Sequence, residues 1–132
     1  MREVSVPYQI PFHDVDSLNI VWHGHYYKYF ELARTELYRS CNFDIADMKH
    51  LGFSFPVIES NCRYNKPLYY GQRITITACF REWTNYVLIA YSILDPVIGK
   101  RLAYGYTKQA VCDAQGLLLM EVPKEVDDVI VD

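Results

Sequence analysis

Titratable side chains are concentrated in one short segment near the start of the chain. Asp14 and Asp16 are followed by His23 and His25, with Gly24 between the two histidines. Carboxylates and imidazoles are the side chains that most often act as general acids and bases, and both also bind metal ions. This segment is therefore the first candidate for chemistry.

A metal site is one interpretation of these histidines. His23 and His25 flank one glycine and Glu31 follows, which is similar to the histidine and glutamate ligands of cupin barrels. However, helical periodicity begins at Tyr26, and two histidines two positions apart on a helix point in different directions. Only His50 remains later in the chain. The sequence therefore predicts no bound catalytic metal.

Acid–base chemistry at the start of a helix is the second interpretation. A loop aspartate, a histidine in the first helical turn and a glycine beside it would bring together a carboxylate, an imidazole and unbonded amide N–H groups. The helix N-terminus can stabilise an oxygen that gains negative charge, while the carboxylate attacks a carbonyl carbon or activates a water that does so. An aspartate before a helix is also a common cap, so spacing alone leaves both roles open for Asp16.

The elements that must position these residues indicate an α+β fold. Apolar residues alternate at period two over residues 4–12, which predicts a strand, and Pro7 and Pro11 place that strand at the edge of a sheet. Over residues 26–41 the apolar positions recur at steps of three and four, which predicts one long helix. That helix needs a sheet to cover its apolar face.

Four β-branched or aromatic runs follow and supply the rest of the sheet. They span residues 55–64, 72–83, 86–95 and 101–113, and a last hairpin and a short terminal segment are expected after them. This order of elements predicts a curled, mainly antiparallel sheet of five or six strands around one long helix. No linker or repeat interrupts the chain, so residues 1–132 are expected to form a single domain.

The composition restricts the classes of partner. A formal net charge of -3 and a pI near 5.8 give no broad basic surface, which argues against nucleic acid or an anionic membrane as the main partner. Since neither a signal-peptide pattern nor a membrane-spanning apolar run is found, we expect a cytoplasmic protein. The cysteines form no CxxC pair and are expected to be reduced and mostly buried; they are Cys41, Cys62, Cys79 and Cys112.

Residues 14–34, DVDSLNIVWHGHYYKYFELAR, resemble the signature of the 4-hydroxybenzoyl-CoA thioesterase family of hotdog-fold proteins. That signature has the form D-x-D-x-x-x-I/V-V-x-H/Y-x-N-Y, followed by an aromatic-rich helix with Glu and Ala-Arg. The matching positions are Asp14, Asp16, Ile20, Val21, His23, Tyr26, Phe30, Glu31, Ala33 and Arg34. The later stretches KPLYYGQRITI, REW and MEVPKE are also similar, so the resemblance covers the whole chain.

The resemblance implies a hotdog fold and the hydrolysis of an acyl thioester carried by coenzyme A or by an acyl carrier protein. Asp16 would be the nucleophile or general base, while the backbone near His23 and Gly24 would polarise the thioester carbonyl. Asp14 is expected to be structural, because it does not occupy the family's catalytic position. The predicted substrate-binding residues are Ile20, Val21, Tyr26, Lys66 and Arg81.

The resemblance also implies how the protein works as a whole. No metal or redox cofactor is expected, and coenzyme A or phosphopantetheine would be present only as part of the substrate. Hotdog proteins of this kind form dimers or tetramers with their sites at subunit boundaries. We expect the same self-association here, with a homotetramer as the predicted assembly.

The chain departs from the family pattern in two places. His25 stands where the family usually has asparagine, so hydrogen bonding at the helix start is expected to differ. Some members hold the phosphates of coenzyme A with arginines after EW and before EVP, where this chain has Thr84, Asn85 and residues 117–120. Scattered cations could replace them, although such a set is more often a solvated surface; they are Arg63, Lys66, Arg81, Lys100, Arg101 and Lys124. Because these arginines are missing, an acyl carrier protein remains an alternative to coenzyme A as the carrier of the acyl group.

Other residues and other functions compete with this interpretation. Related hotdog enzymes take their carboxylate from the helix, but Glu31 would lie about 12 Å along the axis from His23, so a structural role is expected instead, as an ion pair with Arg34 or with a partner in the sheet. A cysteine nucleophile is not expected, because none lies beside a histidine in the sequence. A 3-hydroxyacyl dehydratase is disfavoured, since HGHYY does not resemble the H-F-P motif of that class. A noncatalytic module that binds acyl thioesters remains the third alternative.

Overall fold

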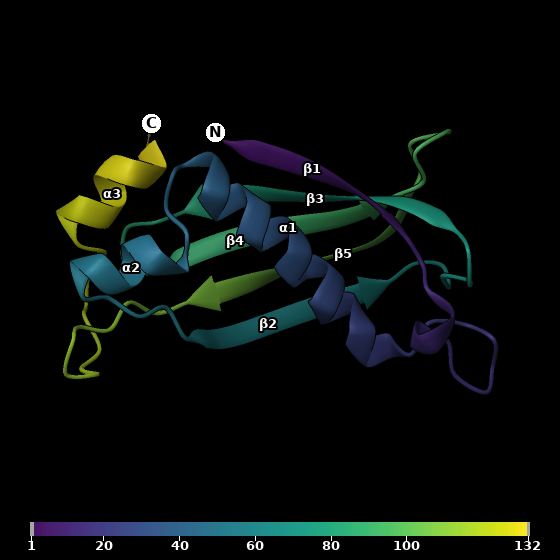
Figure 1. The fold of residues 1–132 in the computed structure, drawn as a ribbon, viewed down its shortest axis with the longest axis horizontal. Helices are drawn as coiled ribbons and strands as arrows, with labels where there is room; N and C mark the ends of the chain where they lie inside the picture. Colours follow the sequence, from purple (N-terminus) through teal and green to yellow (C-terminus); the bar gives the residue numbers. More distant parts are fainter. Residues whose placement is uncertain (1, 132) are drawn as a thin grey trace.

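The computed structural model describes residues 2–131 and consists of one antiparallel sheet with a long helix across one face (Figure 1). The strands lie in the order β1-β3-β4-β5-β2, and every neighbouring pair is antiparallel. They are β1 (Glu3–Gln9), β2 (Val57–Tyr64), β3 (Arg73–Glu82), β4 (Val87–Leu94) and β5 (Arg101–Gln109). The α+β class and the antiparallel sheet are as predicted from the periodicity.

The long helix α1 spans Tyr26–Ser40 and follows a short 3-10 turn, His23–His25. Its buried positions include Tyr29, Ala33 and Leu37, which recur at steps of four as expected for one apolar face. At 1.5 Å per residue the helix is about 22 Å long, enough to cross several strands. The predicted helix is thus confirmed, with its end one residue earlier than the sequence pattern suggested.

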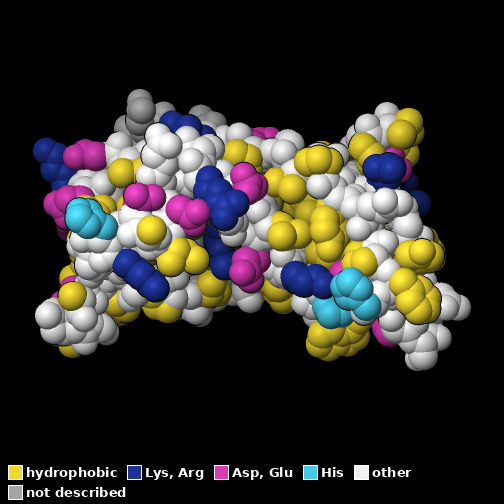
Figure 2. Space-filling view, viewed as in Figure 1, with side chains coloured by type: hydrophobic (Ala, Val, Ile, Leu, Met, Phe, Trp, Pro, Cys, Tyr) yellow, Lys and Arg dark blue, Asp and Glu magenta, His cyan; other side chains and the backbone are white. Residues whose placement is uncertain are grey.

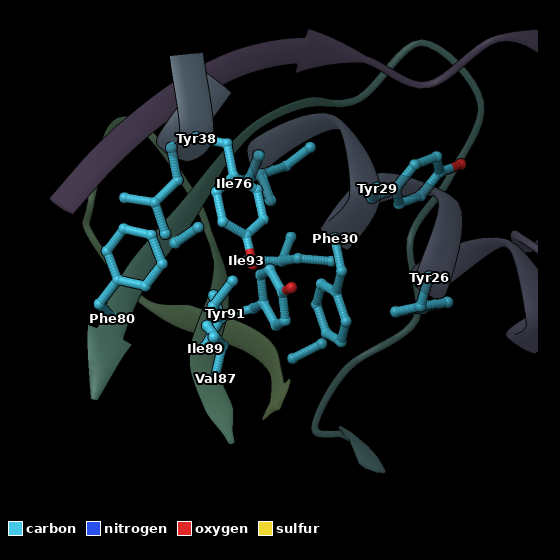
Figure 3. Packing of buried hydrophobic residues seen from close by; sticks show 14 of the residues in the cluster. Tyr26, Tyr29, Phe30, Tyr38, Ile76, Phe80, Val87, Ile89, Tyr91 and Ile93 are labelled. Carbon is cyan, nitrogen blue, oxygen red and sulfur yellow. The ribbon is translucent and has the colours of Figure 1, made fainter. Parts of the chain in front are cut away.

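The contact between α1 and the sheet depends on a glycine in β5. The rings of Phe30 and Tyr91 are stacked, with centroids 4.6 Å apart and planes 5° from parallel (Figure 3). A Cβ on Gly105 would overlap the carbonyl oxygen of Asn61 and come within 3.0 Å of the Phe30 ring. Glycine therefore allows the β2 backbone to approach β5 closely here and leaves room for the Phe30 ring.

The two edge strands differ in how well they are covered. Along β1, exposed and half-buried residues alternate, and Pro7 removes one N–H group, as expected for an edge strand. The helix α1 packs mainly against β1, β3 and β4. In β2, by contrast, most residues are exposed, including Val57 at 45% and Ile58 at 59%. The second edge of the sheet is therefore left open.

The prediction of one long helix was incomplete, because two short helices also form. One is α2, Ile45–Leu51, whose first turn is held by a reciprocal capping box between Asp44 and Asp47. The other is α3, Lys124–Val131, which buries Val126 and Ile130 against the core. The expected last hairpin forms only as a short one: Cys112 and Leu118 are joined by an antiparallel bridge, and the Leu119 N–H donates to the Val111 carbonyl oxygen at 2.8 Å. Within residues 2–131, no helix has the length and apolar character needed to cross a lipid bilayer.

Candidate active site

The loop before α1 folds back on itself in a tight turn that presents Asp16. Val15 and Val21 form a bridge, and the Asp16 N–H donates to the Ile20 carbonyl oxygen at 2.9 Å. One carboxylate oxygen of Asp16 accepts a hydrogen bond from the Leu18 N–H at 2.8 Å. Asn19 adopts a left-handed conformation with φ 64°, which asparagine tolerates better than most residues. The turn therefore fixes the Asp16 side chain while leaving it partly exposed.

Asp16 faces a cavity of about 310 Å³ at the end of the molecule that carries the start of α1. Six of the predicted site residues line this cavity, namely Asp16, Ile20, Val21, His23, Tyr26 and Lys66. They come from the loop, from the helix start and from the connection between β2 and β3, so the fold brings together residues that are distant in sequence. Figure 2 shows histidine and hydrophobic side chains grouped at this end of the molecule.

Four further residues complete the lining, and sequence analysis did not identify them. They are Leu18, Tyr64, Asn65 and Pro67. The Tyr64 hydroxyl donates a hydrogen bond to the His23 carbonyl oxygen at 3.0 Å, so β2 is tied to the turn before α1. Burial raises the pKa of Tyr64 to about 12, with a further contribution from Cys62. The hydroxyl therefore remains a hydrogen-bond donor at neutral pH.

The helix start carries donors that could interact with a bound oxygen. Within residues 2–131, the amide N–H groups of His23 and Gly24 donate to no other protein group. A Cβ on Gly24 would overlap the indole ring of Trp22, which also contacts His23 and His25 with ring centroids 5.1 and 5.3 Å apart. Gly24 therefore lets the indole lie against the turn. The dipole of α1 adds partial positive charge here.

Asp14 lies in a different environment from Asp16. Its residue surface is 1% exposed, and its carboxylate accepts hydrogen bonds from Lys28 at 2.6 Å and from the Tyr29 hydroxyl at 2.7 Å. Burial alone would raise the pKa of Asp14, but the donors Lys28 and Tyr29 outweigh it and the pKa is lowered. The backbone carbonyl of Asp14 also accepts from the Trp22 N–H. These contacts are those of a residue that anchors the loop to α1.

Tyr26 forms part of the cavity wall beside Tyr64. The two rings meet edge to face with centroids 4.7 Å apart, and Tyr26 is buried. Burial raises the pKa of Tyr26 to about 12, and the nearby Cys62 adds to this shift. A protonated, buried tyrosine gives the cavity an apolar wall.

The remaining predicted residues lie elsewhere. β3 pairs its first residue, Arg73, with Gln9 near the cavity, whereas Arg81 lies at the opposite end of the strand (Figure 1). Arg81 is therefore not brought to the cavity within one chain. Glu31 is exposed, and the ion pairs of residues 2–131 do not include the expected one with Arg34.

Potential metal ligands do not form a cluster within the described residues. Across residues 2–131, no group of three or more His, Cys, Asp or Glu side chains is placed to hold a metal ion. Cys41 and Cys79 are buried, and burial raises the pKa of the half-buried Cys62 thiol. A raised pKa reduces the thiolate fraction, which is the reactive form of cysteine. The carboxylate and the helix start are the chemically available groups.

Comparison with known proteins identifies the family of this chain and several relatives. The family model described as the thioesterase-like superfamily matches residues 10–130. A candidate esterase of Aquifex aeolicus is 29% identical over 125 residues, covering 94% of each chain. A candidate acyl-CoA thioesterase of Bacillus subtilis is 29% identical over 96 residues, covering 72% of this chain and 67% of that protein.

A solved structure supports the fold. A mutant 4-hydroxybenzoyl CoA thioesterase, complexed with 4-hydroxybenzoyl CoA, superposes with a TM-score of 0.85 at 19% identity. The match covers 98% of this chain and 99% of that chain. At 19% identity the likeness shows the fold alone, and it confirms the predicted hotdog architecture.

Proposed function

Because the chain belongs to the thioesterase-like superfamily, whose chemistry is thioester hydrolysis, we propose that its cavity cleaves an acyl thioester with Asp16 as the acting carboxylate. The observation that supports this assignment most strongly is the shared cavity. Asp16, His23 and Tyr26 line it together, although they lie on a loop, a turn and a helix. The reaction is acyl-S-carrier plus water to acid plus thiol.

The proposed mechanism places the thioester carbonyl between Asp16 and the start of α1. Asp16 either takes a proton from the water that attacks the carbonyl carbon, or attacks that carbon itself and is released by water. In both routes the C–S bond breaks and the thiol leaves with a proton. A positioned base contributes ~10²- to 10⁴-fold in rate.

The oxygen of the carbonyl gains negative charge as the tetrahedral intermediate forms. The unbonded N–H groups of His23 and Gly24, at the positive end of the α1 dipole, are the donors proposed to stabilise it. One such donor is typically worth ~10²- to 10³-fold in rate. The Tyr64 hydroxyl, bonded to the His23 carbonyl, holds this turn in place.

The substrate is proposed to be an acyl group on coenzyme A or on an acyl carrier protein. Ile20, Val21 and Tyr26 form the apolar part of the cavity, and Lys66 supplies a cation at its wall. Coenzyme A or phosphopantetheine takes part only as the thiol half of the substrate, and no separate cofactor is invoked. A cytoplasmic location remains a prediction.

The proposal is tested by following thiol release over a panel of aromatic, short-chain and long-chain acyl thioesters on both carriers. Asp16→Asn keeps the shape of the side chain but removes its basicity, so kcat should fall at least ~10²-fold. Asp14→Asn is the matched control, because the same change is made two positions away. Equal kcat in Asp16→Asn and the wild type would reject the assignment, and tight acyl-thioester binding without turnover would favour the noncatalytic module.

Self-association is proposed to occur along β2. Among residues 2–131 the outer edge of this strand pairs with no other strand; Ile58 near its start is 59% exposed, and Tyr64 at its other end lines the cavity. An exposed strand edge with apolar side chains is a template for pairing with another strand. A second copy at this edge would complete the site of its neighbour, first as a dimer and, with two such dimers, as a tetramer.

A size measurement in solution tests this assembly. Ile58→Lys places a charge on the proposed interface and should shift the protein toward the monomer, whereas Val97→Lys changes an apolar residue that is 90% exposed in the β4–β5 hairpin and should not. A wild-type protein that runs as a stable monomer of 15.5 kDa would contradict the proposed subunit boundary.

A further inference from the structure

Basic side chains gather at the end of β2 and the beginning of β5, beside the cavity. Lys66 lies in the β2–β3 connection and lines the cavity, while Lys100 immediately precedes β5. Figure 1 shows the β2–β3 connection and the β4–β5 hairpin at the same end of the molecule as the loop before α1. The N–H groups of Asn65 and Lys66 both donate to the Leu102 carbonyl at 3.0 Å, so the backbones of the two segments are joined.

Two arginines extend this basic region along the outer side of the same strands. Arg63 is the register partner of Tyr104 in the β2–β5 pair. The Arg101 guanidinium lies over the Tyr104 ring, 3.8 Å from its centroid. Stacking on an aromatic ring fixes the position of a guanidinium without neutralising its charge. The lysines therefore lie within a wider cationic environment.

The two lysines come from segments whose backbones are hydrogen-bonded to each other, and neither has an ion-pair partner among residues 2–131. The proximity of Lys66 lowers the pKa of Lys100, through a side-chain contact and through charge repulsion. The ion pairs found among residues 2–131 involve other cations, namely His13, Lys28, Arg39 and Lys108. Two neighbouring ammonium groups that form no ion pair with a carboxylate are a favourable position for an anion.

We propose that Lys66 and Lys100 bind the phosphate at the end of the phosphopantetheine arm while the thioester at its other end lies in the cavity. This inference rests on the proposed function, which supplies a substrate with such an arm. The phosphate is common to coenzyme A and to a carrier protein with its phosphopantetheine attached, so the site recognises the chemistry that the two donors share. Lysine ammonium groups bind phosphate as compact point charges.

Binding of the arm without its acyl group tests the site independently of hydrolysis. Calorimetry with 4′-phosphopantetheine and with pantetheine gives the contribution of the phosphate as a ratio of two Kd values. In the wild type this ratio should be about tenfold or more, as expected for charge-assisted hydrogen bonds. It should fall in Lys100→Ala and approach one in the double variant Lys66→Ala/Lys100→Ala.

The matched control is Lys49→Ala, which removes an exposed positive charge from α2 at the other end of the molecule. Its ratio should equal that of the wild type. Because Lys66 and Lys100 are both exposed, the double variant should keep the wild-type melting temperature, which checks that it has folded. A ratio near one in the wild type, a ratio that survives in the double variant, or an equal loss in Lys49→Ala would each overturn the proposal.

Turnover of matched thioesters then identifies the source of the phosphate. The same acyl group is presented on pantetheine, on coenzyme A and on a carrier protein, and KM is measured for the wild type, for Lys100→Ala and for the double variant. A rise in KM of about tenfold in the double variant for coenzyme A, for the carrier protein or for both, with no change for pantetheine in Lys100→Ala, whose side chain does not line the cavity, supports the site and names its donor.

The two proposals can fail separately in these experiments. If the wild type releases no thiol from any thioester but the lysines still control the Kd ratio, the proposed function fails and the phosphate site stands. If thiol is released but KM for both phosphorylated carriers is unchanged in the double variant, the function stands and the site is rejected.

Discussion

Asp14 and Asp16 lie two positions apart in one loop but in opposite surroundings. The Asp14 carboxylate is buried and accepts hydrogen bonds from Lys28 and Tyr29 of α1. The Asp16 carboxylate is half-buried at the cavity and accepts one from the backbone of its own turn. A carboxylate whose oxygens are occupied by fixed donors holds structure together, whereas one with accessible oxygens can interact with a substrate. The set of donors around each carboxylate therefore gives a physical reason for the roles that their positions in the motif suggested.

The largest difference between the two aspartates should be seen in stability. Asp14→Asn removes the charge that Lys28 and Tyr29 contact, so the free energy of unfolding should fall by about 2–3 kcal/mol. Asp16→Asn should change it by less than ~0.5 kcal/mol, as for other surface substitutions. Urea unfolding of both variants measures this difference. Equal losses of unfolding free energy would mean that Asp14 is no more of a structural anchor than Asp16.

The Tyr29 hydroxyl provides a narrower test of the anchor. Tyr29→Phe keeps the buried ring but leaves one oxygen of Asp14 without its donor, so the free energy of unfolding should fall by about 1–2 kcal/mol. In the Asp14→Asn background the same change should cost less, because the hydroxyl has then lost its charged partner. Strictly additive losses in a double-mutant cycle would show that the two side chains do not act together.

A substitution at Gly24 tests the helix start beside Asp16, the aspartate proposed to react. In Gly24→Ala the new Cβ would overlap the Trp22 indole, which must leave the turn. Since about half of Trp22 is exposed, at 48%, the melting temperature should change little, while kcat should fall about tenfold through a displaced donor. The tryptophan emission should shift toward longer wavelength. Unchanged emission together with unchanged kcat would mean that the turn tolerates a side chain there.

The smallest effect is expected from acid titration of the anchor. Because the pKa of Asp14 is lowered in the folded protein, its contribution to stability is present above the unfolded value of about 3.9 and is lost as the pH falls through the lower folded value. The wild type should therefore lose stability below about pH 4 more steeply than Asp14→Asn. Part of the slope should remain in the variant, since the pKa of Asp44 is also lowered, by Arg39. If the free energy of unfolding falls equally steeply with pH in the wild type and in Asp14→Asn, Asp14 does not act as the proposed anchor.

Much of the fold could be predicted from local patterns. The period of two in β1 and the three–four spacing of α1 identify these elements directly, since each buries one face. The short helices were missed because α2 and α3 offer too few turns for a clear period. The capping box of Asp44 and Asp47 was the available signal for α2.

The candidate site was predictable only in part, for a geometric reason. Asp16 and His23 lie in one motif, so their neighbourhood follows from the chain itself. Tyr64 joins them through the pairing of β2 with β5 and the position of α1, which no local pattern encodes. Likewise, charge alone suggested both Lys66 and Arg81, but strand direction places Arg81 at the far end of β3.

The glycine in β5 has a consequence for how the loop and the sheet can vary. The position of a Cβ on Gly105 is closed off first by the Asn61 carbonyl of β2 and then by the Phe30 ring, and Phe30 directly follows Tyr29, whose hydroxyl donates to Asp14. A methyl group added at this position would force the backbone of β2 away from β5 and would also press on the Phe30 ring. The spacing between the sheet and α1 is thus coupled to the position of the loop before α1. A change in that spacing would also change the orientation of the Asp16 carboxylate.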